Sequence, residues 1–210
     1  MFLSHVWGLF AHPAQEWEDI RKERCSIGKC YCSHVLFLAA IPAISSFIGT
    51  TQIGWQIGTA EPVKLTVESA LMISIATYVT MLVAVFSIGW MIHWMGKTYG
   101  TEQQLPQGIA LAAFSATPMF LMGLMALYPI PWLNMIVGMP ALAYSIYLLY
   151  TGLPIMMQVS KEQGFLFASA VMAVGLVVLV AVMAATVIMW GYGIGPVYTS
   201  DLGAFSNLFG

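Results

Sequence analysis

The run FLFASAVMAVGLVVLVAVMAATVIMWGY, from Phe165 to Tyr192, contains no acidic, basic or histidine side chain. The hydrocarbon core of a bilayer is about 30 Å thick, and a helix rising about 1.5 Å per residue crosses it in roughly 20 residues. The run is therefore long enough to span a membrane with some tilt. Its apolar side chains do not alternate with polar ones, which favours a helix over a strand of an outer-membrane barrel.

Four further apolar stretches lie upstream and predict four more transmembrane helices. The expected spans are Val35–Ile53, Val67–Trp94, Ile109–Tyr128, Leu133–Gln158 and Phe165–Tyr192. The composition agrees, because 60% of the 210 residues are hydrophobic and only 8% are charged, which is unlike a soluble domain of this length. We predict an all-α integral membrane protein, a bundle of five transmembrane helices preceded by an N-terminal cytoplasmic amphipathic helix.

The chain is expected to have three parts: an N-terminal amphipathic segment (1–34), a five-helix transmembrane domain (35–192) and an extracytoplasmic C-terminal tail (193–210). In the first part, acidic side chains follow Pro13 and basic ones come later, an order that suits the dipole of a helix lying on the cytoplasmic leaflet. The residues expected at this cytoplasmic interface are Trp7, Trp17, His93 and Lys97.

The orientation follows from the basic residues, since Lys and Arg near the ends of spans are retained in the cytoplasm. Six of the seven basic residues fall on one predicted side: Arg21, Lys22, Arg24, Lys29, Lys97 and Lys161. Lys64 alone falls on the other side. We therefore expect a multi-pass protein of the bacterial inner membrane, with a cytoplasmic N-terminus and a periplasmic C-terminus.

Small and hydroxyl side chains recur at helical spacing within the spans and indicate faces where helices pack closely. The expected packing seams include Ser74 and Thr77 in the second span and Ser145 and Gly152 in the fourth. Alanines mark a similar face of the fifth span: Ala170, Ala173, Ala181 and Ala184. Such faces also suit a homo-oligomer.

A polar stripe follows another face of the fourth span. It consists of Tyr144, Tyr147, Thr151 and Gln158. One interpretation is the lining of a cavity in a small channel or transporter, helped by kinks at the prolines of the spans; the other is that these groups hydrogen-bond neighbouring helices. The prolines that predict kinks are Pro42, Pro118, Pro140 and Pro154.

Three cysteines and a histidine lie just before the first span: Cys25, Cys30, Cys32 and His34. Thiolate and imidazole are ligands that transition metals prefer, but the spacing C-x4-C-x-C-x-H matches no standard zinc knuckle. No metal is expected, and the cluster is the candidate should one bind; the alternative is reduced cytoplasmic thiols near a helix start.

Catalytic motifs such as H-E-x-x-H, G-x-S-x-G or a P-loop do not occur in a plausible context, so we expect no enzymatic activity and no cofactor. The few basic residues are explained by topology, which argues against a nucleic-acid partner.

Four stretches of the chain resemble the bacterial branch of the Yip (Ypt-interacting protein) family. They are L-F-A-H-P-A-Q-E-W (Leu9–Trp17), W-M-G-K-T-Y-G-T-E (Trp94–Glu102), A-T-P (Ala116–Pro118) and Y-S-I-Y-L-L-Y-T-G-L-P (Tyr144–Pro154). The resemblance implies a five-span bundle with a cytoplasmic N-terminus. Eukaryotic members bind prenylated Rab-type GTPases, but their acidic D-L-Y-G-P element does not occur in this sequence, which argues against GTPase binding.

Three functional hypotheses follow. The first is a non-enzymatic inner-membrane protein that acts in membrane organisation through membrane lipids, a homo-oligomer or a membrane-protein partner. The alternative is a small channel or transporter with a polar path along the fourth span. The third is metal handling through the N-terminal cysteines and His34.

Overall fold

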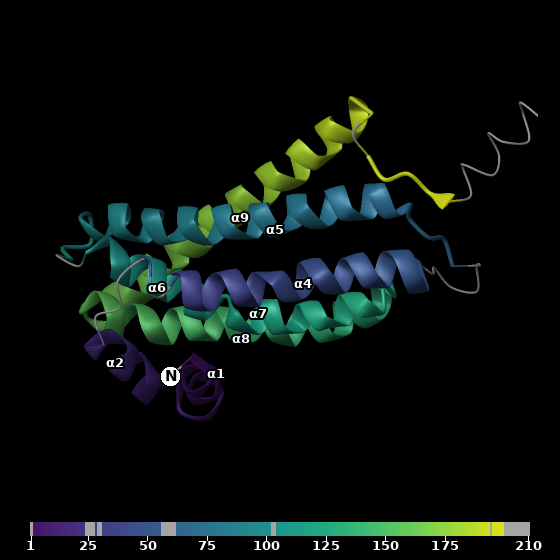
Figure 1. Ribbon diagram of the computed structural model, residues 1–210. Helices are drawn as coiled ribbons and strands as arrows, with labels where there is room; N and C mark the ends of the chain where they lie inside the picture. The colour runs from purple at the N-terminus through teal and green to yellow at the C-terminus, as the bar shows by residue number, and fades with distance from the viewer. Residues whose placement is uncertain are drawn as a thin grey trace, which may run out of the picture.

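The computed structural model describes residues 2–23, 28, 31–55, 62–101, 104–193 and 195–199, and Figure 1 shows how their helices are arranged. In chain order the elements are α1 (Phe2–Ala11), α2 (Pro13–Lys22), the π-helical turn η1 (Tyr31–Val35), α4 (Leu36–Ile48), the π-helical turn η2 (Gly49–Ile53), α5 (Val67–Gly96), α6 (Leu105–Ser115), α7 (Thr117–Met122), the 3-10 helix η3 (Gly123–Leu127), α8 (Pro131–Met157) and α9 (Lys161–Gly191).

Five helical segments of the described chain are long and apolar enough to cross a membrane: Leu36–Ile53, Val67–Gly96, Leu105–Leu127, Pro131–Met157 and Lys161–Gly191. The predicted five-helix integral membrane protein is confirmed. The third and fifth segments start before their predicted apolar runs because residues that favour the start of a helix precede those runs. Pro106 lies in the first turn of α6, and the Ser160 hydroxyl accepts a hydrogen bond from the Gln163 amide at the start of α9.

The third span is interrupted where Pro118 predicts a kink. α6 ends at Ser115, and Pro118 lies in the first turn of the next helix, α7. The span then tightens into η3 at Gly123, where an added Cβ would lie 2.4 Å from the Cβ of Pro42 in α4. Close packing against α4 therefore fixes the end of the broken span.

α6 forms the centre of the bundle. All residues from Gly108 to Ser115 are buried, and the helix packs against α5 and α8. Gly108 permits close approach to α5, since an added Cβ would lie 2.5 Å from the carbonyl oxygen of Gly89. Small residues thus allow backbone contact, as is typical of helices in membranes.

α9 joins the bundle only near its start. Phe167, Ala168 and Val171 are buried, whereas the large side chains from Leu176 to Trp190 are mostly exposed. Figure 1 shows the later part of α9 leaning away from α5. Exposed apolar side chains are expected here, because hydrocarbon surrounds a transmembrane helix.

The described part of the C-terminal tail returns to the start of α5. The Thr66 amide donates to the Val197 carbonyl (2.9 Å), and the Thr199 amide donates to the Lys64 carbonyl (3.0 Å). The Ser69 hydroxyl accepts a hydrogen bond from the Val197 amide (3.1 Å). We call residues 195–199 the strap, because they tie the chain after α9 to α5.

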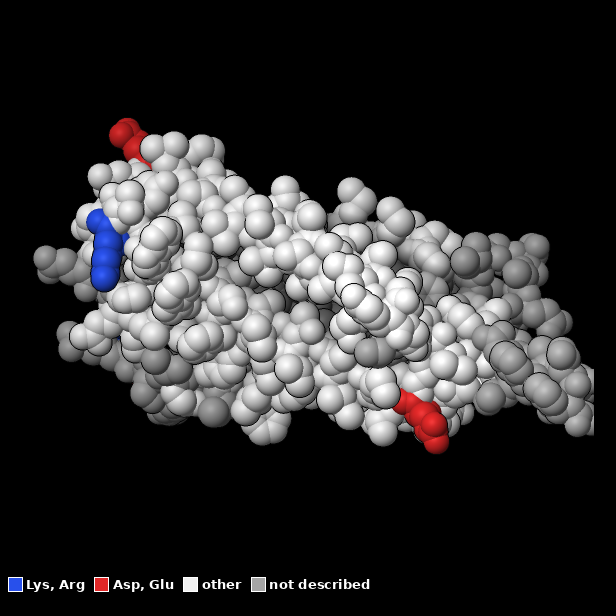
Figure 2. Space-filling model, turned by 90° about the horizontal axis from the view of Figure 1, so that it is seen from above, with Lys and Arg blue, Asp and Glu red and all other residues white. Residues whose placement is uncertain are grey.

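Charged side chains at the start of α5, at its end and at the start of α9 mark the two ends of the bundle. On the face seen in Figure 2, Lys, Arg, Asp and Glu appear at the ends and the broad middle is uncharged. Lys64 and Glu68 flank the start of α5, whereas Lys97 and Lys161 lie at the opposite end, beside the end of α5 and the start of α9. This distribution fits a bundle whose middle lies in hydrocarbon.

Candidate functional site

The candidate site is the region where α1 and α2 fold back onto the bundle, which we call the docking zone. α2 begins with Pro13 in its first turn and has Glu16 in that turn and Arg21 and Lys22 in its last turn, an arrangement favoured by the helix dipole. Its charged side chains are mostly exposed, while Trp17 and Ile20 are buried against the bundle.

Trp17 anchors α2. Its side chain is fully buried. The ring lies against Gly152 of α8, where an added Cβ would be 2.5 Å from an indole carbon. The missing side chain at position 152 therefore provides the space that the indole fills.

Phe114 of α6 is the point where aromatic rings from three N-terminal elements meet. The rings of His5, Trp17 and His34 have centroids 6.0, 6.4 and 4.1 Å from its own. His5 and Trp17 approach edge-on, and His34 is tilted. Offset and edge-on contacts of this kind are favourable beyond the area they bury.

His34 is buried next to the start of the first span. Its Nε2 lies 2.9 Å from the Thr117 hydroxyl of α7. Burial, and secondarily the charge of His5, lower the pKa of His34 from 6.5 to about 3. His34 is therefore neutral in the folded protein at neutral pH.

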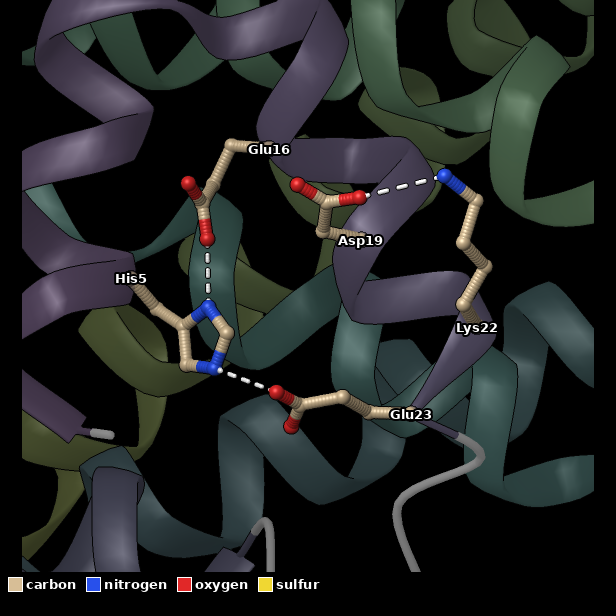
Figure 3. A network of polar contacts seen from close by, with 5 residues as sticks. All are labelled: His5, Glu16, Asp19, Lys22 and Glu23. Carbon is tan, nitrogen blue, oxygen red and sulfur yellow. Dashed lines mark hydrogen bonds and ion pairs between the residues drawn. The ribbon is translucent and has the colours of Figure 1, made fainter.

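His5 links α1 to α2 through two carboxylates, as Figure 3 shows. Its Nδ1 contacts Glu16, and its Nε2 lies 3.2 Å from Glu23. Farther along α2, the Lys22 ammonium lies 3.2 Å from Asp19. The acidic side chains that approach His5 come from both ends of the α2 segment, so they hold the two helices together.

The inner part of this network is shielded and the outer part is not. The side chains of His5 and Glu16 are 14% and 16% exposed, whereas that of Lys22 is 64% exposed. Gly8 makes the inner contact possible, since an added Cβ there would lie 1.8 Å from a Glu16 carboxylate oxygen. The Glu16 carboxylate therefore rests directly on α1.

α1 also contacts α8. The Tyr144 hydroxyl donates to the Leu9 carbonyl (2.8 Å), and the rings of Phe10 and Tyr144 stack with centroids 5.1 Å apart. Leu9 is fully buried, but Trp7 is 76% exposed. α1 thus has one face on the bundle and one face turned outward.

The residues of the predicted polar stripe on α8 lie in different environments. Tyr144 belongs to the docking zone, Tyr147 is exposed, and the Thr151 hydroxyl donates to the Tyr147 carbonyl of its own helix (2.9 Å). Gln158 ends α8 in the left-handed conformation, with φ 55°. A transport path along these residues stays a prediction.

The predicted interface residues also differ from one another. Trp7 is exposed, whereas Trp17 lies inside the protein because Gly152 leaves room for it. His93 is half-buried in the last turn of α5, and Lys97 follows it, exposed. The interfacial position expected for the N-terminal helices stays a prediction.

Only some of the predicted helix-packing positions contact another helix. Gly152 packs tightly on Trp17, Ser74 is buried, and Thr77 donates to the Ile73 carbonyl of its own helix (2.8 Å). Ser145 is half-buried, and its hydroxyl has no hydrogen-bond partner within the described chain. In α9 the predicted alanines are partly or fully exposed: Ala170, Ala173, Ala181 and Ala184.

The metal hypothesis falls largely outside the described residues. Cys25 and Cys30 lie there entirely, and so does the side chain of Cys32. His34, the fourth candidate, contacts Thr117. In the part of the chain that the structure describes, no group of three His, Cys, Asp or Glu side chains could hold a metal ion.

Sequence reasoning missed the roles of His5, Glu16 and Phe114. A histidine within the apolar stretch of α1 was the available signal, because an ionisable group in such surroundings requires a partner. Its partner Glu16 lies 11 residues away on another helix, so helical periodicity could not connect them.

Comparisons with known proteins place this architecture in a family. The Yip1 domain model matches residues 7–182. Two curated relatives, each called inner membrane protein YohC, come from Escherichia coli K12 and O6:H1. Each is 46% identical over 191 residues, covering 91% of this chain and 98% of the relative.

No solved structure matches the chain. The relatives and the five spans support a multi-pass location in the inner membrane. The resemblance seen in the sequence is confirmed, and the chain belongs to the Yip1 domain family.

Proposed function

We propose that this protein is a non-catalytic component of the inner membrane that acts in membrane organisation, through contacts with lipids or with another membrane protein. One observation carries the proposal: α1 is fixed to the bundle by buried Leu9 while Trp7 on its other face is 76% exposed. An exposed tryptophan on a helix without Asp, Glu, Lys or Arg suits contact with a bilayer or a membrane protein.

The polar chemistry of the docking zone supports a structural role for its charged groups. His5 contacts both Glu16 and Glu23, and Arg21 donates to the Ile155 carbonyl at the end of α8 (3.4 Å). These contacts hold α1 and α2 in place. They support binding because they fix the surface that α1 presents. The names of the curated relatives likewise describe a membrane protein and no reaction.

The proposal includes a cytoplasmic N-terminus, which rests on the distribution of basic residues between the two ends of the bundle. Alkaline phosphatase and green fluorescent protein fused to each terminus test it. Fluorescence from the N-terminal fusion and phosphatase activity from the C-terminal fusion are expected. Both termini in one compartment would contradict the odd number of spans.

The function is tested by isolating the full chain from native membranes in mild detergent and identifying bound protein and lipid. A specific lipid or protein is expected to co-purify with the wild type and to be reduced in Trp17→Ala, which removes the anchor of α2. Trp94→Ala, a change of an exposed tryptophan, is the matched control. A strictly monomeric protein without any bound protein or specific lipid would refute the proposal.

A further inference from the structure

The contacts of the docking zone give the depth of α1 along the bundle. α8 has 27 residues, so it is about 40 Å long and exceeds the roughly 30 Å hydrocarbon core by about 5 Å at each end. Tyr144 is the midpoint of α8 (Pro131–Met157). The Leu9 carbonyl and the Phe10 ring, which contact Tyr144, therefore lie about 20 Å from the Met157 end.

α6 gives an independent estimate of the depth of α1. His5 contacts the ring of Phe114, which lies nine residues after Leu105, the start of α6 at the same end of the bundle. Nine residues correspond to about 14 Å of helix. Both ends of α1 therefore lie well below the surface of the bundle.

α2 rises from this level to the surface. Trp17 contacts Gly152, five residues before Met157, and Arg21 contacts the Ile155 carbonyl, two residues before it. These separations correspond to depths of about 8 Å and about 3 Å. α2 thus carries the chain from the depth of α1 to the end of the bundle.

We propose that α1 is immersed in hydrocarbon, between the Met157 end of α8 and the middle of the bilayer, and that lipid acyl chains cover its exposed face. Trp7 and Phe10 then face hydrocarbon instead of headgroups or water. The inference rests on the proposed function and narrows it, because it names acyl chains as the partner of this surface.

The distribution of charge along α1 and α2 agrees with this placement. α1 contains no Asp, Glu, Lys or Arg. At the deeper level, Glu16 contacts His5, and both side chains are shielded. Ionisable groups within a membrane pair with each other, because neither can be solvated there. Toward the surface, Glu18 and Lys22 are more than half exposed, as groups in contact with water can be.

The lipid-facing surface of α8 argues for acyl chains over a second copy of this chain or another protein. Phe10 stacks on Tyr144, so the exposed face of α1 continues directly into α8. The Tyr144 ring lies 5.6 Å from that of Tyr147 in the next turn of α8, and the Tyr147 side chain is 47% exposed. An exposed aromatic surface that runs from α1 onto α8 at the depth of the hydrocarbon suits fluid acyl chains.

Spin labels measure this depth in the full chain. A nitroxide is attached to Trp7→Cys in a background where Cys25, Cys30 and Cys32 are replaced by Ser. The protein is reconstituted in vesicles of phosphatidylethanolamine and phosphatidylglycerol. Power saturation then compares relaxation by oxygen, which concentrates in hydrocarbon, with relaxation by a water-soluble nickel chelate.

The two matched controls are Leu142→Cys, exposed near the midpoint of α8, and Glu18→Cys, exposed on the outer part of α2. The oxygen-to-nickel ratio at position 7 is expected to approach that of position 142 and to be several times that of position 18. A ratio like that of position 18 would overturn the inference. Protection from both reagents would also overturn it, because protein would then cover α1.

Two further measurements keep the test decisive if Trp7→Cys is not monodisperse. Phe10→Cys carries the label to the residue that contacts Tyr144, with the same expected ratio. Lipids brominated on the acyl chains should quench wild-type fluorescence more than that of Trp7→Phe. Equal quenching would contradict immersion.

Failure of this inference is distinguishable from failure of the proposed function. A water-exposed or protein-covered α1 in a protein that still co-purifies a specific partner refutes the inference alone. Immersion of α1 in a protein that binds no specific lipid or protein refutes the proposed function alone.

Discussion

The docking zone and the later half of α9 both contain tryptophan and glycine, but these residues are packed tightly in the docking zone and lie in open surroundings in α9. Trp17 of α2 is fully buried, whereas Trp190 of α9 is 54% exposed. Gly152 has an indole where its side chain would be, whereas an added Cβ at Gly175 would meet nothing within 4 Å. Composition therefore does not decide which small or aromatic residue makes a contact; the partner across the interface decides it.

The largest expected loss of stability comes from removing Trp17, the buried one of the two tryptophans compared above. Trp17→Ala leaves a cavity beside Phe114 and Gly152 and should cost about 3–5 kcal/mol of the free energy of unfolding. Trp190→Ala should change it by no more than about 0.5 kcal/mol. Denaturant titration in mild-detergent micelles measures both. Equal losses would show that the two regions do not differ.

Acid should weaken the docking zone next. The pKa of His34 is lowered from 6.5 to about 3, so the unfolded state binds the extra proton between these values. Stability is then fully present above about pH 6.5 and falls as the pH drops toward 3, on the order of 1 kcal/mol per pH unit. Melting of wild type and His34→Gln between pH 7 and 5 checks this. A wild-type slope no steeper than that of the variant would contradict it.

Substitutions of Gly152 and Gly175 are expected to differ less in their effect on the free energy of unfolding. Gly152→Leu forces α2 away from α8 and should cost about 1–3 kcal/mol. Gly175→Leu adds a side chain in open space and should be neutral or slightly stabilising, because glycine is a poor helix former. Thermal melting of both variants in the same detergent provides the measurement. A destabilising Gly175→Leu would indicate that α9 has a partner at this position.

The smallest effect should come from one hydroxyl. Tyr144→Phe removes the hydrogen bond to the Leu9 carbonyl and should cost about 0.5–1.5 kcal/mol. Tyr147→Phe changes an exposed neighbour on the same helix and serves as the control. Hydrogen exchange of the α1 amides reports the loosening directly. Faster exchange in both variants would argue against a specific role of Tyr144.

The transmembrane helices could be predicted because crossing a bilayer depends on a local property, the length of an apolar run. Their bounds were least accurate where an N-capping serine, Ser160, or a first-turn proline, Pro106, starts the helix before the apolar run begins. The break at Pro118 also follows from the chemistry of one residue.

The docking zone could not be predicted, because its contacts join distant parts of the chain. Leu9 and Tyr144 are 135 residues apart. Gly152 was predicted as a packing position, but nothing in its own helix identifies Trp17 as its partner. A helix that is apolar on every side, such as α9, gives no indication of which face is covered.

The strap has a consequence for the motion of α9. This helix packs on the bundle near Phe167, diverges beyond Val171, and is followed by residues 195–199, which bond to the chain around Ser69. With both extremities attached, the diverging half cannot swing outward without breaking the bonds to α5. Disrupting the strap would leave α9 attached to the bundle only near Phe167, so its later half could then move about that point.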